Sequence, residues 1–280
     1  MPTFTTTGST GKPKTFTISD ETLLKRVSMR STTKGGSFTS IKSLFCDLSL
    51  TRSSAGLTHQ LWAKKNNVKF YTPTADMGSA SEAIKLFQSE NIEGIVANTQ
   101  GLMNYAILAK FAAKSNKDYK FKFKCILATG SDISPDQSKY IRSRLGDVLY
   151  TSYGTSEVGS IALGTSTQIE SIPGCVGPLC AEVQISFDSS KQILVKTSAM
   201  ITKYDNDPDG SLTSTYFKDG WFCTGDFGRL THDGLLVLFS SPSSARSTSL
   251  QSPASLSRPR PTHPDHPDHP DHPAQPKVFR

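Results

Sequence analysis

Apolar residues in the middle of the chain follow two spacings, one typical of helices and one typical of buried strands. Residues 79–90 place Ala83, Ile84, Leu86 and Phe87 at helical spacing, which predicts a helix there. The short apolar run at 94–97 predicts a buried strand. Expected helices and strands continue to alternate along the chain, with a helix at 103–113, a strand at 124–128, a helix at 135–144 and a strand at 148–151.

This regular alternation of strand and helix predicts an α/β fold, with a largely parallel sheet and flanking helices. Ser134 and Pro135 are typical of the start of a helix, with serine as the cap and proline at the first position. After residue 180 the pattern changes to short alternating segments at 183–187 and 193–196, which predict a small antiparallel β unit.

The expected organisation therefore has three parts: residues 1–180, residues 181–239 and residues 240–280. The last part is rich in Ser, Pro and His and contains a His-Pro-Asp repeat at 263–273. Such a composition lacks the apolar residues for a core, so we expect this tail to be disordered. Its four repeat histidines could bind a transition metal loosely, but a shifted reading frame or an aberrant splice after Phe239 explains the change of composition more simply.

Charge and cysteine content narrow the function classes for the chain of 280 residues. Lysine and arginine total 31 against 24 acidic residues, a net charge of +7, but the lysines are scattered, which favours an anionic small ligand and excludes nucleic acid as the expected partner. The five cysteines form no CxxC pair, so neither a disulfide framework nor a zinc site is expected. No signal peptide or membrane span is predicted, no protein partner is evident, and the expected location is cytoplasmic.

The segment 5–14 combines hydroxyl side chains, glycines and lysines near the N-terminus. Glycines let a backbone approach a ligand closely, and amide, hydroxyl and lysine groups donate to phosphate oxygens. The segment lacks the Walker spacing, since two residues separate Gly8 from Gly11 and Pro13 follows Lys12. Composition alone fits a phosphate-binding loop and an ordinary flexible loop equally well.

Two later segments favour the phosphate-binding interpretation. Residues 153–157 read Tyr-Gly-Thr-Ser-Glu after an apolar strand, and residues 220–226 end in Thr-Gly-Asp. In this order the three segments resemble the phosphate loop, the Tyr-Gly-x-Thr-Glu motif and the Thr-Gly-Asp motif of the adenylate-forming superfamily, most closely the acyl-CoA synthetases. Weaker similarities lie at 127–132 and 174–179, and the resemblance covers roughly residues 1–240.

The resemblance implies a role for each matching residue. The nucleotide-binding positions would be Thr7, Gly8, Ser9, Thr10, Gly11, Lys14, Gly130, Ser131, Asp132, Tyr153, Gly154, Thr155, Ser156 and Asp226. Thr10, Lys14 and Glu157 would be catalytic, with Glu157 coordinating Mg²⁺. Taken alone, Glu157 would be typical of a surface carboxylate at a helix start, and Tyr153 of a core aromatic residue.

The implied reaction is ATP-dependent activation of a carboxylic acid, as in fatty acid metabolism, with Mg²⁺ and with coenzyme A as the acceptor. Residues 1–180 would then be the nucleotide-binding region. The family's first strands, its Gly-Arg-x-Asp hinge and its C-terminal lysine domain have no counterpart here, so the sequence suggests a piece truncated at both ends and impaired in catalysis. A catalytically inactive nucleotide-binding remnant and a non-functional gene fragment remain as alternatives.

Overall fold

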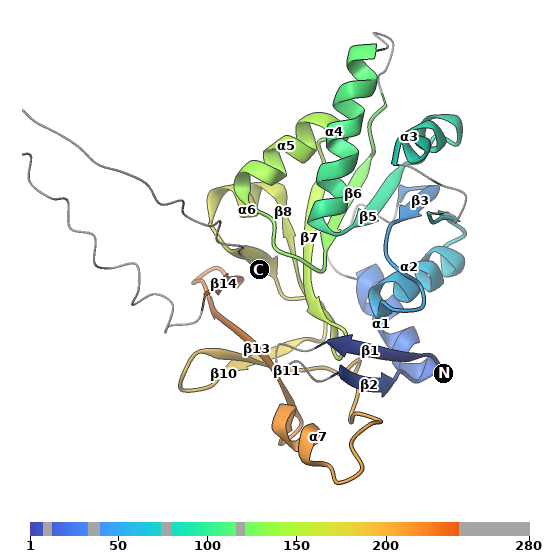
Figure 1. Ribbon diagram of the computed structural model, residues 1–280. Helices are drawn as coiled ribbons and strands as arrows, with labels where there is room; N and C mark the ends of the chain where they lie inside the picture. The colour runs from blue at the N-terminus through green and yellow to red at the C-terminus, as the bar shows by residue number, and fades with distance from the viewer. Residues whose placement is uncertain (8–12, 33–39, 74–79, 116–120, 241–280) are drawn as a thin grey trace, which may run out of the picture. The chain divides into compact units, whose positions relative to one another are not determined.

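The computed structural model of the chain describes residues 1–7, 13–32, 40–73, 80–115 and 121–240 (Figure 1). Within them, a mostly parallel six-stranded sheet carries helices on both faces, and a second, antiparallel sheet follows it in the chain. The α/β fold class with an antiparallel β unit is therefore confirmed. No helix in these ranges has the length and apolarity needed to cross a bilayer.

The parallel sheet has the strand order β4-β3-β5-β6-β7-β8, in which β8 alone runs antiparallel to its neighbour. Its strands are β3 (Ser43–Cys46), β4 (Lys69–Tyr71), β5 (Gly94–Ala97), β6 (Cys125–Thr129), β7 (Leu149–Thr155) and β8 (Gly159–Thr165). The helices are α1 (Asp20–Thr32), α2 (Ser54–Lys65), α3 (Ala80–Ser89), α4 (Thr99–Ser115), α5 (Pro135–Leu145), α6 (Ser166–Ser171) and α7 (Ser211–Tyr216).

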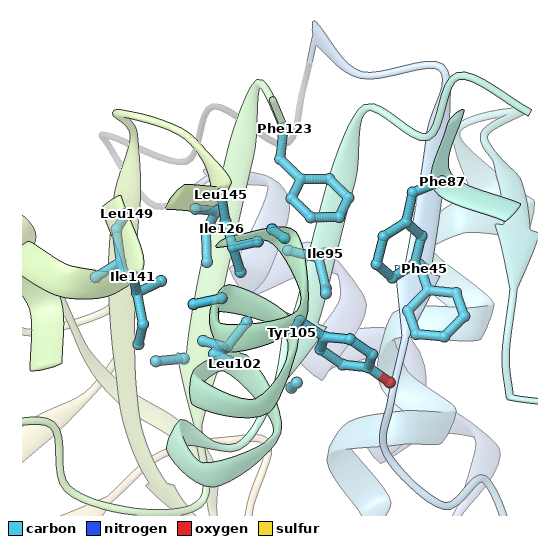
Figure 2. Close-up of a cluster of buried hydrophobic side chains, with 14 of the residues drawn as sticks. Phe45, Phe87, Ile95, Leu102, Tyr105, Phe123, Ile126, Ile141, Leu145 and Leu149 are labelled. Atoms are coloured by element: carbon cyan, nitrogen blue, oxygen red, sulfur yellow. The ribbon is translucent and has the colours of Figure 1, made fainter. Parts of the chain in front are cut away.

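Both faces of the parallel sheet are buried because alternate strand residues enter two different cores. Leu149 packs in a cluster with α3, α4 and α5, whereas its neighbour Tyr150 packs in a cluster with α1 and α2. The first cluster gathers aromatic rings at one end and aliphatic side chains at the other (Figure 2). The Phe87 ring lies 4.9 Å from Phe45 and 5.0 Å from Phe123 between centroids, at angles typical of edge contacts.

The predicted helices form, with one boundary displaced. The helix expected at 79–90 is α3, and α5 begins at Pro135 with a capping box, in which Ser134 and Gln137 satisfy each other's backbone N–H. The helix expected at 103–113 begins earlier, at Thr99. Asn98 explains the difference, because its Oδ1 accepts a hydrogen bond from the Gly101 N–H at 2.7 Å and so caps the helix there.

The antiparallel sheet has the order β10-β11-β13-β14-β9, with β12 paired to β13. Its strands are β9 (Cys175–Pro178), β10 (Gln184–Phe187), β11 (Gln192–Lys196), β12 (Phe217–Lys218), β13 (Trp221–Leu230) and β14 (Leu235–Phe239). A separate hairpin, β1 (Thr3–Thr7) and β2 (Pro13–Thr17), flanks the segment predicted to bind phosphate. The hairpin packs through Phe4 and Phe16 against Ile201 and Tyr204.

Candidate functional site

Strand β7 runs four residues beyond the end predicted from the sequence and carries the first part of the 153–157 segment. The chain then turns at 156–158 and returns as β8. The two strands approach so closely that a Cβ on Gly154 would lie 2.2 Å from the Gly159 carbonyl oxygen. Only glycine fits there, which explains the glycine of the Tyr-Gly-Thr-Ser-Glu segment.

Glu157 lies inside the protein, so its interpretation as a surface carboxylate at a helix start is wrong. Only 5% of the residue is exposed. Its Oε1 accepts a hydrogen bond from the Tyr204 hydroxyl at 3.0 Å and lies 3.7 Å from the Lys14 Nζ. Burial, reinforced by the nearby Glu157 charge, raises the pKa of Tyr204 above its ordinary value, so this hydroxyl stays a donor.

Lys14 is equally buried and approaches the same carboxylate from β2. Its Nζ also lies 3.8 Å from the centroid of the Tyr216 ring, a cation–π contact that helps to hold a cation away from water. Two segments that the sequence places far apart, 13–17 and 156–158, thus bring a cation and an anion together in a water-poor site.

Arg26, on α1, fixes the backbone around Glu157. Its Nε, Nη1 and Nη2 donate to the carbonyl oxygens of Ala199, Ser156 and Glu157 at 3.0, 3.1 and 2.8 Å. Burial lowers the pKa of Arg26 to about 10, while the Glu157 charge opposes that shift. Arg26 was not predicted from the sequence, because nothing there distinguishes it from its neighbour Lys25.

A pocket of about 860 Å³ opens at the carboxyl ends of β6 and β7. Among the residues that line it are Gly130, Ser131, Asp132, Tyr153, Gly154 and Asp226, all of them predicted site residues. The Tyr153 hydroxyl donates to Asp226 Oδ2 at 2.8 Å, which joins β7 to β13 across the pocket. Burial, together with the Asp226 charge, raises the pKa of Tyr153 and keeps this hydroxyl protonated.

A second, smaller cavity of about 150 Å³ lies on the other face of the sheet, beside α1 and α2. Its lining includes Thr155 and Ser156 from the predicted segment, and it shares Gly130, Ser152 and Gly154 with the larger pocket. A register shift between Tyr153 and Gly154 interrupts the strand alternation at this point. The extra residue is Ile161 of β8, and at this end of β7 Tyr153 lines the larger pocket and Thr155 the smaller one.

The structure describes only the strand residues on either side of the predicted phosphate loop. Thr7 ends β1 opposite Pro13 of β2, whereas Gly8, Ser9, Thr10 and Gly11 lie outside the described residues. Asn206 holds β2 in place, since its Oδ1 accepts from the Thr15 N–H and its Nδ2 donates to the Pro13 carbonyl oxygen, each at 2.9 Å. The loop between the strands therefore starts and ends at anchored positions.

The carboxylates at the site do not form a protein cage for a metal ion. Within the described ranges, no three His, Cys, Asp or Glu side chains gather closely enough to hold one. A single buried carboxylate such as Glu157 fits Mg²⁺ that completes its shell with substrate phosphates and water, which is the usual way that proteins hold this ion. The five cysteines are thiols, and no disulfide joins them.

Comparison with known proteins rests on structure, because the sequence matches no protein-family model and no curated protein. The chain is similar to the O-succinylbenzoate coenzyme A synthetase MenE from Bacillus subtilis, solved with AMP, at 20% identity and a TM-score of 0.70, over 86% of this chain and 49% of that one. MenE was also solved with ATP and magnesium ion.

Two further structures have the same architecture. The amide bond synthetase McbA from Marinactinospora thermotolerans matches at 21% identity and a TM-score of 0.68, over 85% of this chain and 48% of that one. The N-terminal domain of FACL13 from Mycobacterium tuberculosis matches at 18% identity and a TM-score of 0.67, over 83% of this chain and 58% of that one. The chain spans about half the length of the structures it matches. The described part of the chain therefore has the fold of part of the large domain of these enzymes.

Proposed function

We propose that this chain binds ATP with Mg²⁺ and activates a carboxylic acid as its acyl-adenylate, which then passes to a thiol such as that of coenzyme A. The observation that carries the proposal is the convergence of three distant segments at the end of β7. Lys14 lies 3.7 Å from Glu157, and Tyr153 donates to Asp226 at 2.8 Å. Neighbours with this fold are adenylate-forming ligases, which supports carboxylate activation in general.

In this proposal, the larger pocket holds the nucleoside. Tyr153 lies against the purine ring, Ser131 and Asp132 flank it, and Asp226 accepts both ribose hydroxyls in a bidentate contact. Asp226 already accepts a hydrogen bond from Tyr153, so its carboxylate is oriented before the ribose arrives. The volume of about 860 Å³ suits a ligand of nucleotide size.

The phosphates lie toward Lys14 and Glu157. Ser9, Thr10 and Lys14 bind the β- and γ-phosphates, Ser156 contacts the α-phosphate, and Glu157 is the carboxylate ligand for Mg²⁺. The metal ion supplies neutralisation of phosphate charge. Arg26 keeps the Ser156 and Glu157 carbonyls in one place, and Tyr204 orients the Glu157 carboxylate, so these residues position the site without touching the substrate.

The chemical step is attack of a carboxylate oxygen on the α-phosphorus, with pyrophosphate as the leaving group. The protein's share of this step is to hold the two reactants in line and to place positive charge where negative charge develops. The acceptor is the less constrained part of the proposal, since the neighbours include both a coenzyme A synthetase and an amide bond synthetase.

Calorimetric titration with AMP, and with ATP in the presence and absence of Mg²⁺, tests the proposal. We expect binding of both nucleotides and a requirement for Mg²⁺ with ATP only. Asp226→Ala should weaken both, by about 2 kcal/mol for a lost charge-assisted ribose contact, or roughly thirtyfold. Asp233→Ala, at an exposed turn, is the matched control and should leave both affinities unchanged.

Carboxylate-dependent exchange of pyrophosphate into ATP then separates the enzyme from the alternative of an inactive nucleotide-binding remnant. Exchange that requires both an acid and Glu157 would establish adenylation. Nucleotide binding without exchange for any acid would favour the remnant. Equal affinity of the wild type and Asp226→Ala for AMP would contradict the ribose assignment.

A further inference from the structure

The smaller cavity is the least explained feature of the site, because most of its lining, apart from Thr155, Ser156 and the residues shared with the larger pocket, has no role in nucleotide binding. It meets the nucleotide pocket only at Gly130, Ser152 and Gly154. Two of these residues are glycines, so at those two positions no side chain separates the cavities, and the third, Ser152, turns its hydroxyl to Ser160 at 3.2 Å. A group in the smaller cavity could therefore reach the α-phosphate through the junction while the rest of it stays apart from the nucleotide.

Helix α2 gives the cavity its length. Ser54, in the first turn, is next to the junction, since its Oγ donates to the Ser156 carbonyl oxygen at 3.4 Å. Trp62 lies eight positions further on, roughly 12 Å along the helix at about 1.5 Å per residue. Its side chain is buried within the cluster between α1, α2 and the sheet, so the cavity ends against this packed core.

The volume sets the size of what the cavity can hold. At about 150 Å³ it is smaller than the roughly 300 to 1,000 Å³ typical of sites for drug-sized ligands. An apolar cavity of about 150 Å³ in another protein holds a benzene ring. A long acyl chain exceeds this space.

The chemistry of the lining disfavours a second charge on the ligand. Met29, Leu48 and Leu163 contribute apolar surface. Arg26 is the one permanently charged side chain among the described residues that line the cavity, and each of its three nitrogens already donates to a backbone carbonyl. Thr58 likewise donates its hydroxyl to the Ser54 carbonyl oxygen at 2.7 Å and turns its methyl group away from that bond.

We propose that this cavity holds the acyl part of the acid substrate, and that it selects compact, uncharged acyl groups of about the size of one aromatic ring. The inference rests on the proposed function, because it takes the junction as the place where the carboxylate meets the nucleotide. It narrows the substrate class to single-ring or short branched monocarboxylic acids and excludes long-chain fatty acids.

Trp62 provides a direct readout of this cavity. The chain has two tryptophans, so Trp221→Phe leaves Trp62 as the only one. We expect benzoate to change the Trp62 fluorescence saturably. Decanoate and 2-naphthoate, which carry the same charge on a larger body, should bind at least roughly tenfold more weakly, in line with the discrimination that a closed apolar pocket achieves.

Two variants at one position serve as each other's control. Thr58→Met fills the cavity and should abolish benzoate binding, whereas Thr58→Ala should keep benzoate and strengthen 2-naphthoate binding. Both variants lose the same hydroxyl hydrogen bond, so a difference between them reports volume. Circular dichroism confirms that each variant is folded before the comparison.

The outcomes distinguish this inference from the proposed function. Equal binding of benzoate and 2-naphthoate, no binding of benzoate, or equal benzoate affinity in the wild type and Thr58→Met would each overturn the compact-acid inference, even if AMP binds. Failure of AMP to bind while benzoate still binds with the expected size selection would overturn the proposed function and leave the cavity assignment supported.

Discussion

Asp47 is a half-buried carboxylate just beyond β3 that the proposed site does not use. Its Oδ2 accepts a hydrogen bond from the Tyr105 hydroxyl at 3.0 Å. Burial raises the pKa of Asp47 above its ordinary 3.8, and the Tyr105 hydrogen bond only partly offsets this. A carboxyl group with a raised pKa favours the folded state when protonated, and this contribution is lost as the pH rises through the folded-state pKa.

Asp47→Asn should therefore be more stable than the wild type at pH 7. The amide carries no charge to bury, and its oxygen can still accept from Tyr105. The advantage should shrink as the pH falls through the raised folded-state pKa and should vanish below 3.8, where the wild-type carboxyl is protonated in both states. Urea unfolding at several pH values measures the difference, with Asp233→Asn at the exposed turn as the control. A variant that is less stable at pH 7 would contradict this reading of Asp47.

At the scale of elements, α5 shows how local sequence determines a boundary. Ser134, Pro135 and Gln137 form the cap predicted from sequence, and the helix begins where they place it. Ser134→Ala should lower the free energy of unfolding by about 1 kcal/mol, the usual effect of losing an N-cap. Ser143→Ala, an exposed serine in the same helix, should change it by less than about 0.5 kcal/mol.

Urea midpoints of the two serine variants provide the comparison for α5. Equal losses would mean that the Ser134 cap contributes nothing beyond an ordinary surface serine.

The start of α4 shows the limit of local prediction, because its first turn, from Thr99, lacks the apolar periodicity that marks the rest of the helix. Asn98 is the one local signal there. Strand β7 was also underestimated, since its last residues pair with β8 through a bulge that no sequence pattern revealed.

Within the whole molecule, the site depends on contacts between the N-terminal hairpin and residues 205–206. Asn206 hydrogen-bonds both Thr15 and Pro13, and Asp205 Oδ2 accepts from the Thr17 hydroxyl at 2.7 Å. These contacts hold the hairpin that bears Lys14. Asn206→Ala should therefore weaken ATP binding by up to roughly thirtyfold, since it removes two hydrogen bonds of about 1 kcal/mol or less each, and should spare AMP, which lacks the outer phosphates.

Calorimetry with ATP and AMP tests whether the Asn206 contacts affect binding of the outer phosphates. Asn104→Ala, on the exposed surface of α4, is the control. An equal loss of ATP and AMP affinity in Asn206→Ala would show a general disturbance of the fold instead of a displaced phosphate loop.

The motif residues could be proposed from the sequence because their types and order in the chain carry information, whereas the residues that support them could not. Arg26 and Tyr204 look like ordinary surface and loop residues until the chain folds. Their importance comes from burial and from partners more than 40 residues away in the sequence, such as the Tyr204 contact with Glu157 across 47 positions. The two cavities likewise depend on how α1, α2 and the antiparallel sheet pack around β7.

Strand β7, with one cavity on each face, has a kinetic consequence. Under the proposed assignment each ligand occupies its own cavity, and among the described residues the two cavities share only Gly130, Ser152 and Gly154, so neither ligand has to be in place for the other to bind. Addition of nucleotide and acid should then follow no compulsory order. Strand β7 thus separates the two reactants everywhere except at this junction, where only their reacting ends meet.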